Sequence, residues 1–202
     1  TTLFRSKQII VSLEREFGSG GHKIAQAIAQ EFGYKYYSKN ILGEMFSDRP
    51  KHAEAMAEYE EKGAPFLTRH VRGHSSSTAE TLARMEFDFI RERADAGESF
   101  VIVGRCGGMV LRDYPGLITY FVMADMYDKV IRVCDREGLS QRDAMAKIAR
   151  IDRMRKKYHD QYCDFKWGDS RAYDLSVNIS RLGLEATTKA MIDYTRNWVE
   201  MQ

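Results

Sequence analysis

The chain has 202 residues, of which 44% are hydrophobic and 30% are charged, and its formal net charge is only +2. This length and composition fit one globular domain with a substantial core. The near balance of charge argues against a general nucleic-acid coat, whose surface would be strongly basic. No apolar run approaches the length of a membrane span. We therefore expect neither nucleic acid nor membrane as a partner.

The cysteines indicate the compartment. Cys106, Cys134 and Cys163 are odd in number and widely spaced, and they form no C-x-x-C pair. This pattern is typical of reduced thiols, so we expect a cytoplasmic protein. A homo-oligomer is compatible with the sequence, which does not fix the oligomeric state.

The first elements are a buried strand at about 8–13, a glycine-rich turn, and a helix at about 21–32. Apolar residues recur at helical spacing in that helix, and Gly33 supplies a C-terminal stop. A short aromatic strand follows at 34–37. Ser38 is typical of an N-cap and predicts a helix through about residue 46.

The middle of the chain is more polar. A highly charged helical segment at 51–63 is interpreted as a solvated face, and 64–78 is expected to be irregular. A long helix is predicted at about 78–96. The apolar runs at 100–104 and 117–123 are typical of parallel strands that are buried on both faces.

The last third continues the alternation. Asp125 and Gly138 bracket one helix, and Ser140 begins the capping box of the next, which extends toward Lys157. A final strand is predicted at 173–179 and a final helix at 184–199. Strands separated by helices indicate one α/β domain with a mostly parallel sheet covered on both faces. Ligands of such sheets bind beyond the carboxyl ends of the strands.

The glycine-rich turn after the first strand suits phosphate. Gly18, Gly20 and Gly21 let the backbone approach an anion closely, and the following helix adds the positive end of its dipole. The pattern G-x-x-x-x-G-K-[ST] is incomplete, however. With Gly20 as the second glycine, Arg15 stands at the first glycine, Gly21 at the lysine and His22 at the Ser/Thr. The alternative is a turn that only shapes the fold.

Arg105 directly follows the strand at 100–104 and is flanked by glycines. An arginine at the carboxyl end of a strand can fork onto a phosphate in the cleft. The alternative is an arginine that is paired with a carboxylate for structural reasons.

A basic stretch at 150–157 is predicted to be helical, which stacks Arg153 and Lys157 one turn apart. Like charges at this spacing repel unless anions or acids neutralise them. A basic lid over transferred phosphates uses that property, whereas the alternative is a solvated helix end favoured by the dipole.

Two further residues near the turn have open roles. Glu14 can hold a Mg²⁺-bound water, accept the proton of an acceptor, or pair with Arg15 or Arg105. Lys23 lies two positions after the lysine position, which turns it roughly 200° around the helix and toward solvent. His70 and His74 have no third ligand at a suitable spacing, so no metal site is predicted from them.

Five blocks occur in order along the chain, and together they resemble the cytidylate kinase-like family of P-loop proteins. They are VSLEREFGSGGHKI at 11–24, VIVGRC at 101–106, DRMRKKY at 152–158, KWGD at 166–169 and YDL at 173–175. The resemblance implies a three-layer P-loop NTPase fold with a five-stranded parallel sheet and helices on both faces. It further implies one domain over 1–202, with a helical acceptor-binding insertion at 40–97 and a lid at 150–170.

The same resemblance implies a kinase that transfers a phosphoryl group from ATP, with Mg²⁺, to a small acceptor such as the nucleoside monophosphate CMP. It implies a donor-phosphate site at Gly18, Ser19, Gly20, Gly21, His22 and Lys23. The implied catalytic residues are Glu14, Arg105, Arg153 and Arg155. Arg105 would bind the acceptor phosphate, and the other two arginines would close over the transferring group. The alternative is a non-catalytic nucleotide- or phosphate-binding regulatory module, which the missing lysine motivates.

Overall fold

The computed structural model describes residues 8–38, 41 and 78–202. The charged segment predicted at 51–63 lies outside the described residues, as do His70, His74 and nearly all of the helix predicted after Ser38.

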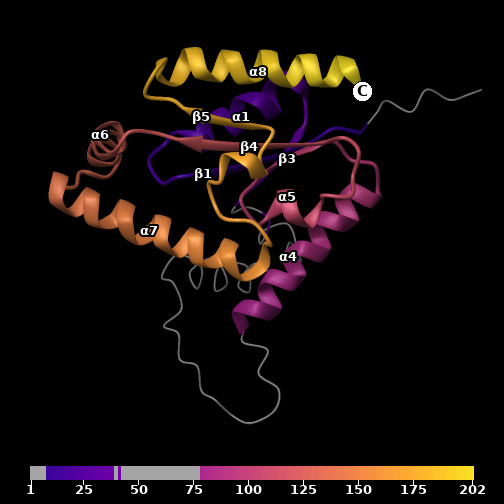
Figure 1. Ribbon diagram of the computed structural model, residues 1–202, viewed down its shortest axis with the longest axis horizontal. Helices are drawn as coiled ribbons and strands as arrows, with labels where there is room; N and C mark the ends of the chain where they lie inside the picture. Colours follow the sequence, from indigo (N-terminus) through magenta and orange to yellow (C-terminus); the bar gives the residue numbers. More distant parts are fainter. Residues whose placement is uncertain (1–7, 39–40, 42–77) are drawn as a thin grey trace, which may run out of the picture.

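Five parallel strands form one sheet in the order β2-β3-β1-β4-β5 (Figure 1). The strands are β1 (Ile10–Arg15), β2 (Lys35–Tyr37), β3 (Phe100–Val103), β4 (Leu117–Met123) and β5 (Leu175–Asn178). The predicted parallel sheet is therefore confirmed. Strand β1 is central, with β3 on one side and β4 on the other, and the chain crosses between these sides from β3 to β4. The topological switch point therefore lies at the carboxyl end of β1.

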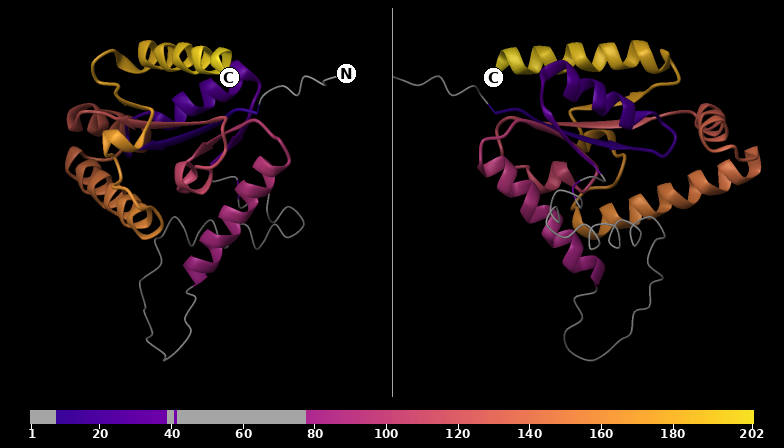
Figure 2. Two further views of the ribbon diagram at one scale, coloured as in Figure 1. Left: turned by 45° about the vertical axis from the view of Figure 1, so that its right-hand side comes forward. Right: turned by 180° about the vertical axis from the view of Figure 1, so that it is seen from behind.

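The helices are α1 (Gly21–Phe32), α4 (Thr78–Asp95), α5 (Gly107–Val110), α6 (Met126–Glu137), α7 (Gln141–Tyr162) and α8 (Gly183–Met201), with a 3-10 turn η1 (Ser170–Ala172). Helices α1 and α8 cover one face of the sheet, and α4, α5 and α7 lie on the other (Figures 1 and 2). Helix α6 lies past the carboxyl end of β4. None of the described helices is long and apolar enough to cross a membrane.

Strand β1 is buried on both faces, which explains its continuous apolar sequence. Val11 and Leu13 pack with α1 and α8, while Ile10 packs on the opposite face with α4. Each of the three side chains is at most 1% exposed. The two halves of the core therefore meet across this strand, which fixes where its carboxyl end emerges.

Several predicted boundaries are confirmed, and others differ. Helix α1 begins and ends as predicted, with Gly33 in the left-handed conformation at its C-terminus. Strand β1 extends two residues further, to Arg15. Helix α7 continues past Lys157 to Tyr162, because residues on one of its faces pack toward the sheet. The four-residue helix α5 was not predicted, since Gly107 and Gly108 favour a turn.

Candidate active site

The glycine-rich loop connects β1 to α1 at the switch point. Gly18 and Gly20 have φ of +79° and +83°, conformations that favour glycine. A Cβ at Gly18 would stand 3.1 Å from the carbonyl oxygen of Lys129, so α6 closely backs the loop. Ser19 is fully buried and points inward, where its Oγ donates to the Glu16 carbonyl at 2.8 Å. The loop thus presents backbone rather than side chains.

The two loop residues after Gly21 point outward. His22 is exposed, and its Nδ1 lies 2.7 Å from the Tyr36 hydroxyl. Lys23 is exposed and lines a groove of about 700 Å³ between α1 and α8. Their role in nucleotide binding, and that of Gly18 to Gly21, stays a prediction.

A buried cation holds the loop from behind. Lys129 of α6 is 5% exposed, and its Nζ lies 2.9 Å from Glu16 Oε2 and 3.4 Å from Asp152 Oδ2. Asp152 Oδ1 also accepts a hydrogen bond from the Phe17 backbone N–H at 2.6 Å. Burial raises the pKa of Asp152, while the Phe17 N–H and Lys129 oppose that shift. These contacts join the loop after β1 to α6 and α7, which are far from it in sequence. The sequence alone did not indicate them.

Arg155 of α7 reaches the same place from the other side. Its Nη1 donates to the Arg15 carbonyl at 2.9 Å, and its guanidinium lies 5.6 Å from the centre of the Phe17 ring. Burial and the neighbouring Arg15 lower the pKa of Arg155. A guanidinium nevertheless remains charged at neutral pH. The structure therefore places a poorly solvated positive charge beside the loop.

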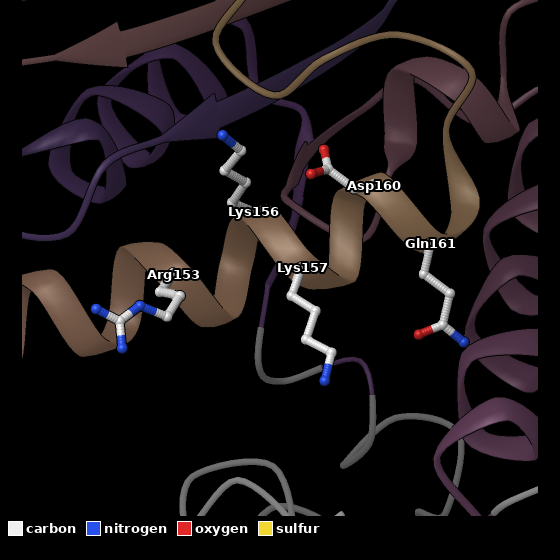
Figure 3. Close-up of a pocket in the computed structure, with 5 residues that line it drawn as sticks. All are labelled: Arg153, Lys156, Lys157, Asp160 and Gln161. Atoms are coloured by element: carbon white, nitrogen blue, oxygen red, sulfur yellow. The ribbon is translucent and has the colours of Figure 1, made fainter.

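Arg153 does not share this position. Two residues along a helix turn a side chain by roughly 200°, and Arg153 is exposed on α7 with Lys157 and Gln161 (Figure 3). With Lys156 and Asp160 these residues line an open pocket of about 410 Å³. The structure brings Arg155, but not Arg153, to the loop.

Arg105 follows β3 in an unusual backbone conformation. Arg105 and Cys106 have φ of +59° and +52°, and such strain in consecutive non-glycine residues is a feature of functional sites. Arg105 Nη1 lies 3.1 Å from Glu86 Oε1, and Glu86 is 1% exposed. The carboxylate pairing considered as an alternative is thus observed. It fixes the guanidinium, and phosphate binding by Arg105 stays a prediction.

Glu14 is 8% exposed at the carboxyl end of β1, and its Oε2 accepts a hydrogen bond from Trp167 Nε1 at 3.3 Å. The segment after α7 is thereby tied to the strand. From the sequence, pairing of Glu14 with Arg15 or Arg105 was one possibility. The hydrogen-bond partner in the structure is instead Trp167, which lies 153 positions away. The described residues contain no group of three or more potential metal ligands.

A thiol cluster lies behind Arg105. The Cys106 thiol is 3% exposed and lies near the Cys163 thiol, and the His159 imidazole acts on Cys163 electrostatically. The Cys106 hydrogen bond lowers the pKa of Cys163 to about 6, with a further contribution from His159, although burial opposes the shift. The Cys106 pKa is raised by the same hydrogen bond and by burial. Both thiols are free, as predicted for reduced cysteines.

The fold and the loop define a P-loop kinase-like protein. The shikimate kinase of Bacteroides thetaiotaomicron has the same fold, with a TM-score of 0.57 at 13% identity over 95% of this chain and 98% of that one. The structure of an uncharacterized protein from Eubacterium ventriosum is more similar, with a TM-score of 0.73 and 35% identity over 94% of this chain and 99% of that one.

Sequence comparison identifies the family. The profile of the cytidylate kinase-like family matches residues 10–181. The chain is also 23% identical to the cytidylate kinase of Pyrobaculum aerophilum, over 93% of this chain and 92% of the relative. This chain belongs to the cytidylate kinase-like family.

Proposed function

We propose that this protein is a kinase that transfers a phosphoryl group from ATP, with Mg²⁺, to a nucleoside monophosphate such as CMP. One observation carries the proposal. Arg15 and Arg155 converge on the glycine-rich loop at the carboxyl edge of the sheet, and Arg105 is near enough to act on Arg15 electrostatically. The Arg155 guanidinium contacts the Arg15 backbone, and the Arg15 guanidinium lies against Gly104. Phosphoryl transfer depends mainly on positioning and on neutralising charge, which such a group supplies.

The loop has the properties that a triphosphate needs. Gly18 and Gly20 open the backbone, and the N-terminus of α1 begins directly after them. For Mg²⁺ the described residues offer the carboxylate of Glu14, and protein sites for this ion commonly use one or two carboxylates together with substrate phosphates. When bound, the ion would neutralise negative charge on the phosphates.

The proposed roles follow from position. Residues Gly18 to Lys23 form the donor side, and Arg105, fixed by Glu86, faces the acceptor phosphate. Arg155 stabilises the transferring group. Arg153 faces away from the loop in this structure, so a role for it would require movement of the proposed lid at 150–170. The insertion at 40–97 would recognise the acceptor base.

An ADP-release assay over a panel of nucleoside monophosphates tests the proposal. We expect turnover with at least one acceptor in the presence of ATP and Mg²⁺. Absence of turnover with every acceptor, in protein that melts cooperatively, would contradict catalysis.

The role of Arg105 needs a matched variant. Arg105→Ala alone would leave the buried carboxylate of Glu86 without its arginine and lower the free energy of unfolding by about 3–5 kcal/mol. Arg105→Gln combined with Glu86→Gln removes both charges together. We expect the KM for the acceptor to rise at least about tenfold in the double variant, since a charge-assisted hydrogen bond contributes about 1.5–3 kcal/mol. An unchanged KM would remove Arg105 from the acceptor site.

One observation favours a second candidate, a non-catalytic nucleotide-binding regulatory module. Gly21 stands where P-loop kinases have a lysine that contacts the transferring phosphates. Calorimetry that detects ATP binding without turnover on any acceptor would favour this alternative.

A further inference from the structure

The side chain of Arg15 occupies the space that the missing lysine would need. A Cβ built on Gly21 would stand 2.7 Å from Arg15 Cβ and 3.2 Å from Arg15 Cγ. Real Cβ atoms do not approach other carbons this closely, so an arginine in this conformation requires glycine at position 21. The stem of Arg15 therefore crosses the first residue of α1.

The other end of Arg15 rests on a second glycine. A Cβ on Gly104 would stand 2.6 Å from Arg15 Nη1. Gly104 directly follows β3, the neighbouring strand, and has φ of +75°. The Arg15 side chain thus extends from the first turn of α1 to the carboxyl end of β3. The phosphates of a donor would lie at this edge of the sheet.

The Arg15 guanidinium has no carboxylate partner within the described part of the chain. Glu14 and Asp152 are near enough to act on it electrostatically, but neither lies within ion-pair distance. Burial, with a contribution from Arg105, lowers the pKa of Arg15. A desolvated cation without a bonded anion is unfavourable by itself, and an anionic ligand relieves that cost.

The sequence pattern gives this arrangement a simple meaning. In the numbering of G-x-x-x-x-G-K-[ST], Arg15 stands at the first glycine and Gly21 at the lysine. The cation and the glycine have exchanged positions, and the two positions touch in space. The charge has moved six residues along the chain while staying at the same loop.

We propose that Arg15 is the phosphate-binding cation of the loop, contacting the β- and γ-phosphates of a nucleoside triphosphate in place of the lysine that Gly21 replaces. This inference rests on the proposed function for its ligand, ATP. It identifies Arg15, rather than Lys23, as the residue that compensates for the lysine, because Lys23 is exposed in the groove between α1 and α8.

A charge swap tests the inference. Arg15→Gly, Gly21→Lys and the double variant are compared with the native chain by calorimetry with ATP and Mg²⁺ and by thermal melting. We expect Arg15→Gly to keep the native melting temperature and to bind ATP at least tenfold more weakly. Gly21→Lys alone should melt earlier, since its side chain collides with Arg15. The double variant should recover both the melting temperature and most of the affinity.

Recovery of affinity is the informative result, because a purely structural role for Arg15 would not be restored by a lysine six residues away. Arg142→Ala, which removes an exposed charge from the first turn of α7, serves as the control for net charge and should bind ATP as the native chain does. Native affinity in Arg15→Gly, or a double variant that binds no better than Arg15→Gly, would overturn the inference.

Failure of the proposed function gives a different pattern. If the native chain binds ATP and the swap behaves as expected but no acceptor is phosphorylated, the role of Arg15 stands and catalysis does not. If the native chain does not bind ATP, both proposals are overturned.

Discussion

Two sets of cations meet at the carboxyl edge of this sheet, and they are treated in opposite ways. Lys129 is bonded to two carboxylates, Glu16 and Asp152. Arg15 and Arg155 lie at the same loop, yet neither has a carboxylate within ion-pair distance among the residues described. Lys129, neutralised by the protein, holds the loop together, whereas Arg15 and Arg155, which have no paired carboxylate among the described residues, are ready for an external anion.

The largest expected effect concerns Lys129, the cation that is paired with carboxylates. Lys129→Met leaves the partly buried carboxylates of Glu16 and Asp152 without their cation, so we expect a loss of about 3–5 kcal/mol in the free energy of unfolding. Urea denaturation measures it. The matched control is Lys189→Met, which breaks an exposed pair with Asp193 and should cost under about 1 kcal/mol. Equal losses in the two variants would show that the buried pairs do not stabilise the loop.

The next effect concerns the set without counter-charges. Arg155→Ala removes one hydrogen bond to the Arg15 carbonyl and no ion pair among the described residues, so the expected cost to stability is only about 0.5–1.5 kcal/mol. The affinity for ATP should fall about 10- to 100-fold, as expected for loss of a charge-assisted contact. Calorimetry and urea denaturation of the same samples separate the two quantities.

Arg142→Ala is the control for Arg155→Ala, since Arg142 is exposed in the first turn of the same helix. It should leave both quantities unchanged. A large loss of stability in Arg155→Ala with native ATP affinity would show that Arg155, like Lys129, has a structural role. The distinction between paired and unpaired cations at the loop would then fail.

The smallest expected effect concerns a negative charge in the same region, the Cys163 thiolate. The pKa of Cys163 is lowered to about 6, so the thiolate forms as the pH rises through that value. Alkylation of Cys163 by iodoacetamide should therefore rise between about pH 5 and 7 and then level off, because the thiolate is the nucleophile. Peptide mass spectrometry distinguishes Cys163 from Cys106 and Cys134. Cys106→Ala should move the midpoint upward, and an unchanged midpoint would contradict the hydrogen bond.

The elements with local signals were predictable from the sequence. Periodicity and Gly33 predict α1, and the apolar run at 117–123 predicts β4. Ser140 caps α7 as predicted, its Oγ accepting a hydrogen bond from the Asp143 N–H at 3.2 Å. The number of strands was expected only through the family resemblance. Their order β2-β3-β1-β4-β5 was not predicted, because it is not local information.

The site was less predictable, because its contacts join distant segments. Nothing in the sequence pairs Lys129 with Glu16, or Trp167 with Glu14. The separation of Arg153 from Arg155 could have been predicted, since two residues of a helix place side chains on nearly opposite faces. The relation between Arg15 and Gly21 also had a signal, namely a glycine at the lysine position together with an arginine at the first glycine.

The hydrogen bond from Trp167 to Glu14 gives the protein an intrinsic optical probe. The chain contains only two tryptophans. Trp198 packs against the core beneath α8, whereas Trp167 lies between the Glu14 carboxylate and the Phe121 ring, 5.2 Å between ring centres. Indole emission responds to such polar neighbours, so a shift of the segment after α7 would change the fluorescence of one tryptophan over the constant background of the other. A shift of this segment could therefore be measured from the intrinsic fluorescence of the native chain, without a label.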